Sequence, residues 1–181
     1  MSGRAAGRED AGMTLIEIII GLGVVVIAII GIMSALVSAS RVDEATAEQV
    51  RALNACKSAI EQMKQVPFAE AWRRFNSNAA DDPGGSGTAP GRNFAVAGLR
   101  AQPGDADGLP GQILFPELGG NLCETVVESR MGMPRDLNGS GNPPSDLNVN
   151  TTYMILPVRV VVDWQGASGP YHMEMTTFLF Q

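Results

Sequence analysis

The sequence predicts an α+β fold, in which a long N-terminal α-helix packs against a small C-terminal antiparallel β-sheet. Three patterns support it: an apolar run at residues 18–37, a helical apolar stripe at residues 41–66, and strand-like segments between residue 112 and the C-terminus. The chain of 181 residues has room for one compact domain beyond a membrane segment. We therefore take residues 1–12, 13–40, 41–66 and 67–181 as successive parts of the chain.

The first element is the apolar run. From Ile18 to Val37 every residue is apolar or glycine except Ser34. As a helix this run is about 30 Å long, which matches the hydrocarbon core of a bilayer. It is longer than the core of a secretory signal, and no small-residue cleavage site follows it, so we expect it to stay with the protein. Arg4 and Arg8 favour a single-pass topology with the N-terminus in the cytoplasm.

The helical pattern continues through residues 38–66, which contain neither glycine nor proline. Charged residues, Glu48 among them, are expected off the apolar stripe. Pro67 ends the pattern, so one helix from about residue 14 to residue 66 would be about 80 Å long. Its second half is amphipathic and must pack against the C-terminal part of the chain. The stripe comprises Val42, Ala45, Val50, Leu53, Cys56, Ile60 and Met63.

The C-terminal part is predicted to be a loop-rich sheet domain. Residues 67–75 add a short turn of helix, and residues 76–111 are rich in turn-forming residues, with one short strand at 94–99. The last two of four stronger strands form a hairpin across residues 165–170. The four strands are Gln112–Phe115, Leu122–Ser129, Tyr153–Trp164 and Tyr171–Phe180.

A single carboxylate, Glu17, stands at the start of the apolar run, and no other charge follows before Arg41. At the centre of a bilayer it would cost about 2.5–3.5 kcal/mol, and less near the edge. A helix N-terminal acid at headgroup level explains its tolerance but not its neighbours. The sequence GMTLIE at residues 12–17 closely resembles the processing site of the type IV pilin superfamily. Met13 stands where phenylalanine is commonest in that family.

This resemblance implies a type IV pilin-like fold and a processing pathway. The prepilin peptidase and methyltransferase would remove residues 1–12 by cleavage after Gly12 and would methylate the new amine of Met13. An α-amine is largely protonated at neutral pH. In a filament, Glu17 of one subunit would pair with the Met13 amine of its neighbour. The pairing would select the axial register, because each charge alone is costly in an apolar surrounding.

The resemblance also implies location and partners. Before assembly the chain would span the inner membrane through residues 13–40, with residues 67–181 in the periplasm. It would then join other major and minor pilins in a pilus or pseudopilus. We expect no nucleic acid partner, because the net charge is −6 and the sequence shows no basic patch.

Two features favour a minor pilin that assembles into or primes a type IV pilus. The membrane half of the helix carries no proline, and the sheet domain is rich in loops. The C-terminal hairpin with Trp164 is similar to that of minor pilins of the PilV type. One alternative is a minor pseudopilin of a type II secretion system; a DNA-uptake pilin would need a basic surface. A different class is a membrane-anchored periplasmic binding module that does not polymerise.

We expect no enzyme activity. The sequence contains no nucleophile, metalloprotease or phosphate-loop motif. His172 is the only histidine, and it lies in a predicted strand without an evident partner, so we interpret it as structural.

Two further hypotheses concern cross-links and ions. Cys56 and Cys123 either form one disulfide that closes a long loop or are two small buried residues. One loop places oxygen side chains as in the first half of a calcium loop, but Leu147 stands where the closing glutamate belongs. We therefore favour a solvated turn over a Ca²⁺ site and expect no other cofactor. The candidate Ca²⁺ ligands are Asp136, Asn138, Ser140 and Asp146.

Overall fold

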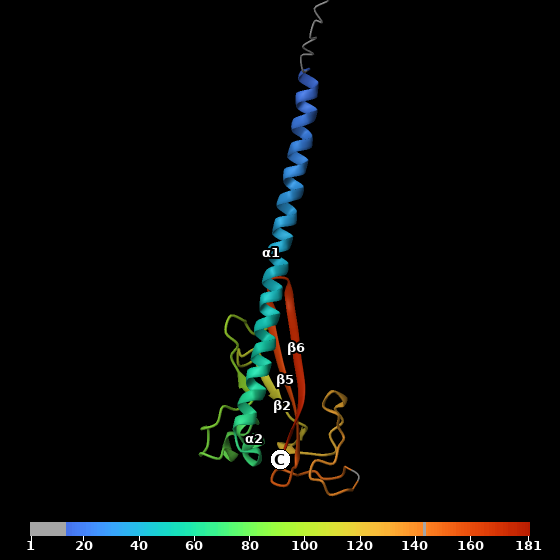
Figure 1. Ribbon diagram of the computed structural model, residues 1–181. Coiled ribbons are helices and arrows are strands. Elements are labelled where there is room, and N and C mark those ends of the chain that lie inside the picture. The colour runs from blue at the N-terminus through green and yellow to red at the C-terminus, as the bar shows by residue number, and fades with distance from the viewer. Residues whose placement is uncertain (1–13, 143) are drawn as a thin grey trace, which may run out of the picture. The chain divides into compact units, whose positions relative to one another are not determined.

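The computed structural model describes residues 14–142 and 144–181. They belong to two compact units, one that ends at Asp43 and one that comprises Glu44–Gln181. Helix α1 (Leu15–Gln65) begins in the first unit and ends in the second (Figure 1). The single long helix predicted over residues 14–66 is confirmed.

In the second unit, α1 contributes one face to the hydrophobic core. Ala52, Cys56 and Met63 are at most 1% exposed and pack in one cluster with the sheet. Three details of the predicted stripe are wrong. Val42 and Val50 are 64% and 51% exposed, and Glu48, which was placed off the stripe, is buried. The buried face follows positions 48, 52 and 56, because steps of four keep side chains on one side of a helix.

The main sheet has four antiparallel strands in the order β1-β2-β5-β6. Strand β5 provides its centre, and five of its side chains are at most 1% exposed. Complete burial of one such aliphatic side chain contributes about 1.5–3 kcal/mol. The strands are β1 (Asn93–Phe94), β2 (Gly111–Leu114), β5 (Ile155–Gly166) and β6 (Gly169–Phe180), and the five buried side chains are Leu156, Val158, Val160, Val162 and Trp164.

Strands β5 and β6 form the predicted hairpin, but its loop is shorter than expected. Pairing runs without interruption from Ile155↔Phe180 to Gly166↔Gly169, which leaves only residues 167–168 as the turn. Gly169 has φ +132°, a backbone conformation that favours glycine. Two-residue turns of this kind match the twist of antiparallel strands.

The strand predicted at Leu122–Ser129 is wrong. Only Asn121–Leu122 (β4) is extended and paired, with Glu117–Leu118 (β3). Beyond Leu122 the chain leaves the ladder, because the backbone N–H of Glu124 donates to the carbonyl of Asp146 at 2.9 Å. A 3₁₀ turn follows at Ser129–Met131 (η2).

The segment between α1 and the sheet agrees better with the prediction. Phe68–Phe75 forms helix α2, as expected for residues 67–75. A 3₁₀ turn follows at Ala79–Asp81 (η1). The strand expected at residues 94–99 is shorter, because the N–H of Leu99 turns back to the carbonyl of Val96 at 3.1 Å.

Candidate functional site

The first turn of α1 is fixed by Thr14. Its carbonyl accepts from the N–H groups of Glu17 at 3.0 Å and of Ile18 at 3.2 Å. Its hydroxyl oxygen lies 3.4 Å from the N–H of Glu17. Thr14 therefore occupies the N-cap position, and Glu17 is the third helical residue. Gly12 and Met13, where processing is predicted, lie outside the described residues.

The Glu17 side chain is exposed at this helix end. Within residues 14–142 and 144–181, no group hydrogen-bonds or ion-pairs with its carboxylate. The N–H groups of the first helical turn favour a negative charge there, so the carboxylate is tolerated without a side-chain partner.

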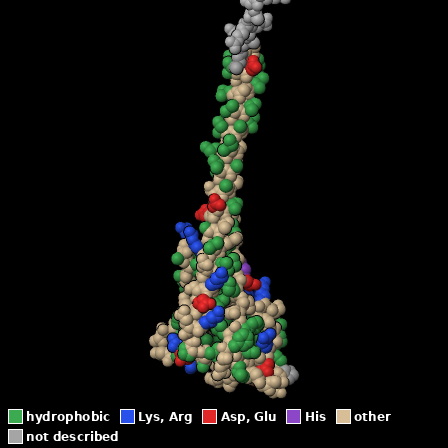
Figure 2. Space-filling model, viewed as in Figure 1, with side chains coloured by type: hydrophobic (Ala, Val, Ile, Leu, Met, Phe, Trp, Pro, Cys, Tyr) green, Lys and Arg blue, Asp and Glu red, His purple; other side chains and the backbone are tan. Residues whose placement is uncertain are grey.

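The rest of the first unit is an uncovered apolar helix. The large side chains from Leu15 to Val37 are 47–77% exposed, and Figure 2 shows hydrophobic side chains along this part of α1. The hydroxyls of Ser34 and Ser40 donate to carbonyls one turn earlier, at 2.9 and 3.1 Å, so they need no other partner. α1 thus contains a segment long and apolar enough to span a membrane.

Three glycines interrupt this apolar surface. A Cβ built on Gly21, Gly23 or Gly31 would meet no atom within 4 Å. Packing inside this unit therefore does not require glycine at these positions. Small residues on an apolar helix allow a second helix to approach its backbone closely.

Glu48 is a second unusual carboxylate on α1. It is 9% exposed, and its Oε2 accepts from the indole N–H of Trp164 at 3.0 Å. A Cβ on Gly166 would lie 2.4 Å from that oxygen and 2.8 Å from the Tyr171 ring, so a larger residue there would force these side chains to shift. This contact joins α1 to the turn end of the β5–β6 hairpin, and nothing in the sequence pattern predicted it.

The candidate calcium loop is closed by its own hydrogen bonds. Asp136 Oδ1 accepts from the N–H of Gly139 at 2.8 Å, and Oδ2 accepts from the N–H of Gly141 at 2.8 Å. These bonds, that of Gly141 foremost, lower the pKa of Asp136 below its usual range. Asn138 donates to Asp146 at 2.7 Å. Among the residues that the structure describes, no three acidic, histidine or cysteine side chains converge to hold a metal ion.

Glu124 organises the same loop, and the sequence did not single it out. Its side chain is 1% exposed, and its carboxylate accepts four backbone N–H groups. Oε1 accepts from Leu137 at 2.8 Å and Asn138 at 3.3 Å, and Oε2 accepts from Ser145 and Asp146, both at 3.3 Å. One buried side chain thus ties together both ends of residues 137–146.

Cys56 and Cys123 are free thiols, so the disulfide considered above is not formed. Cys56 lies in the main core, and burial raises its pKa to about 11. Cys123 lies outside that cluster, with its sulfur 3.1 Å from the Thr125 hydroxyl oxygen. The two thiols therefore have different surroundings.

His172, which was expected to lack a partner, lies between two carboxylates. Its Nδ1 is 2.8 Å from Asp163 and its Nε2 is 3.3 Å from Glu174. The hydrogen bond to Asp163, helped by Glu174, raises the pKa of His172 above its usual value of 6.5. Because the carboxylates occupy opposite ring nitrogens, the three groups do not converge on one reacting atom or ion.

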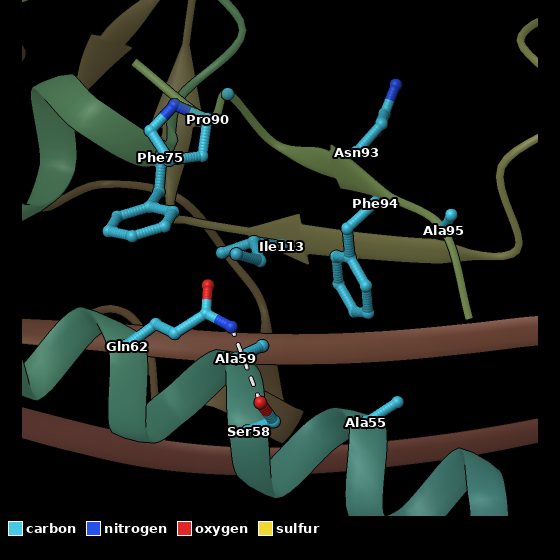
Figure 3. A pocket seen from close by; sticks show the side chains of 11 residues that line it. Ala55, Ser58, Ala59, Gln62, Phe75, Pro90, Asn93, Phe94, Ala95 and Ile113 are labelled. Carbon is cyan, nitrogen blue, oxygen red and sulfur yellow. Dashed lines mark hydrogen bonds between the residues drawn. The ribbon is translucent and has the colours of Figure 1, made fainter. Parts of the chain in front are cut away.

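A cavity of about 170 Å³ lies between α1 and the β1–β2 edge of the sheet. Phe75, Phe94 and Ile113 form much of its wall, opposite Ala55 and Ala59 on α1 (Figure 3). Its lining contains no titratable side chain. The cavity therefore provides no general acid or base, and its chemistry suits an apolar group.

Comparison of the chain with protein-family models, with curated proteins and with solved structures finds no match. The function is therefore inferred from the residues described above.

Proposed function

We propose that this chain is a minor pilin, which assembles into or primes a type IV pilus after cleavage at Gly12 and methylation of Met13. One observation carries the proposal: Glu17, whose carboxylate has no partner among the described residues, lies on the first turn of a helix whose large apolar side chains from Leu15 to Val37 are all uncovered. A helix that is apolar on every side needs lipid or other helices around it. A pilin subunit is surrounded first by lipid in the bilayer and then by other helices in the filament core.

The contacts at the helix start support this role. Thr14 caps α1 from within the mature chain, so the helix keeps its cap after residues 1–12 are removed. Glu17 is then four residues from the new amine of Met13. The exposed glycine backbone at positions 21, 23 and 31 allows neighbouring helices to approach closely.

Intact mass of the membrane-extracted protein tests the processing step. In cells with the prepilin peptidase, we expect loss of residues 1–12 and gain of one methyl group. Without the peptidase, the leader should remain. Cleavage should also be lost in Gly12→Val and retained in the matched control Gly21→Val, which changes a glycine within the helix. An intact leader in the presence of the peptidase would contradict the proposal and leave a membrane-anchored module that does not polymerise.

A second measurement separates processing from assembly. In Glu17→Gln, we expect normal cleavage and about tenfold less chain in sheared filaments, because the neutral amide cannot form the ion pair in an apolar surrounding. Glu44→Gln is the matched control, since Glu44 is an exposed carboxylate on α1 outside the apolar run. A processed chain that enters only a secretion pseudopilus would identify the type II system instead.

A further inference from the structure

We propose that the outer edge of β6 binds an extended strand from a different pilin-like subunit, which adds to the sheet beside residues 171–179. This inference rests on the proposed function, because it names the kind of partner that a minor pilin would meet in a filament or tip complex. The argument uses the hydrogen-bonding state of β6, its side chains and the lengths of the two sheet edges.

The outer edge of β6 is open. In the strand order β1-β2-β5-β6, β6 is the last strand, and Figure 1 shows it at the margin of the sheet. Among the described residues, its backbone bonds go to β5, apart from one that the Gln102 side chain donates to the Tyr171 carbonyl at 3.2 Å. A strand with such an edge is a template for another strand.

The hydrogen bonds of β5 show which β6 amides face outward. The N–H groups of Asp163 and Gln165 donate to Pro110 and Arg100 carbonyls, on the side of β5 away from β6. The residue on β6 opposite Asp163 is His172. Because the Asp163 N–H points away from β6, Asp163 and His172 do not exchange backbone hydrogen bonds. Alternation along the strand then directs the N–H groups of residues 172, 174, 176 and 178 to the open edge.

The apolar face of the sheet also continues to this edge. Tyr171, Met173 and Met175 pack against the core but are only partly buried, whereas Val160 and Val162 beside them on β5 are 0% exposed. An added strand would cover these three side chains. The fitting strand alternates apolar residues on this face with polar residues on the other.

The edge lacks the usual features that prevent strand addition. β6 pairs with β5 over twelve residues without a bulge and contains no lysine, and its one proline, Pro170, lies next to the turn. Glu174 is already paired, with Arg130 at 2.9 Å and Arg159 at 3.2 Å. Its charge is therefore compensated on its own face of the sheet.

The lengths of the sheet edges argue for a different protein as the partner. The opposite edge is β1, which has only two residues, Asn93–Phe94. If a second copy joined head to tail, its two-residue β1 would have to pair with the twelve-residue β6. Pairing of β6 with β6 of a second copy would create a two-fold dimer, which closes and does not extend a filament. A longer strand of another subunit would pair with more of β6 than β1 does, and it would not close the assembly as a two-fold dimer.

Thr176→Pro tests this proposal in the full chain, expressed with its filament system. The substitution removes an outward N–H and blocks strand addition, while proline is tolerated on the open side of an edge strand. We expect about tenfold less chain in sheared filaments than for wild type. Thr176→Val keeps the N–H and should assemble normally. Leader cleavage and buried-tryptophan fluorescence should be unchanged in both variants.

Amide exchange on wild-type protein gives an independent readout. In filaments, compared with the detergent-solubilised chain, the amides of His172, Glu174 and Thr176 should exchange at least about tenfold more slowly. Equal exchange in both states, or equal assembly of Thr176→Pro and Thr176→Val, overturns the edge proposal. Cross-linking of the Thr176→Cys variant to a second copy of the chain also overturns it. Absence of processed wild-type chain from filaments contradicts the proposed function itself.

Discussion

Replacement of Glu124 by glutamine tests whether one buried carboxylate holds the loop at residues 137–146. Glu124 is 1% exposed, and each of its oxygens accepts two backbone N–H groups. The amide of glutamine offers only one acceptor oxygen. That oxygen can serve the N–H groups of Leu137 and Asn138, while the new NH₂ group faces those of Ser145 and Asp146.

The expected cost follows from these contacts. Two bonds to a charged acceptor become neutral and two are lost, although Ser145 and Asp146 are exposed enough for water to replace the lost bonds. We therefore expect Glu124→Gln to lower the free energy of unfolding by about 2 kcal/mol, and Glu124→Ala by about 4 kcal/mol. For a unit of this size, 2 kcal/mol lowers Tm by about 6–8 °C.

Denaturant unfolding of the detergent-solubilised chain measures this loss. Trp72 and Trp164 are both 1% exposed, so their fluorescence reports the opening of the second unit. Glu61→Gln is the matched control, because the Glu61 side chain is 63% exposed and pairs with Lys64 on the same helix. If Glu124→Gln unfolds within about 0.5 kcal/mol of that control, the carboxylate does not hold the loop.

Three further predictions concern other contacts of the second unit. Gly166→Ala should lower the free energy of unfolding by about 1–3 kcal/mol, because its Cβ would lie 2.4 Å from the buried Glu48 carboxylate; unchanged circular dichroism melting would contradict this. His172 has a raised pKa, so its contribution to stability should be present below about pH 6.5 and lost as the pH rises through its higher folded value. His172→Gln should remove this part of the pH dependence of Tm. Millimolar Ca²⁺ should leave Tm unchanged, because Asp136 already accepts backbone N–H groups; a rise would show that a cation replaces them.

Signals local in sequence predicted the elements well. The ends of α1 at Leu15 and Gln65 lie within one residue of the prediction, because Pro67 stops a continuous helical pattern. Two local signals were missed. The T-x-x-E pattern at Thr14 and Glu17 marks a capped helix start. The glycines at 166 and 169 indicate a two-residue hairpin turn, which is tighter than the six-residue loop predicted.

Contacts distant in sequence could not be predicted in this way. The burial of Glu48 depends on Trp164, which is 116 residues later in the chain. The strand expected at Leu122–Ser129 fails because Glu124 binds backbone groups 13 to 22 residues away. In both cases a polar side chain took a buried position that hydrophobic periodicity assigns to apolar residues.

Cys56 and Cys123 are both 0% exposed and unlinked, which gives a way to measure how often the second unit opens. An alkylating reagent reaches either sulfur only when the surrounding structure opens. When intact cells are treated with such a reagent, the mass that alkylation adds to the chain therefore reports how much of the chain has opened, and no purified protein is required.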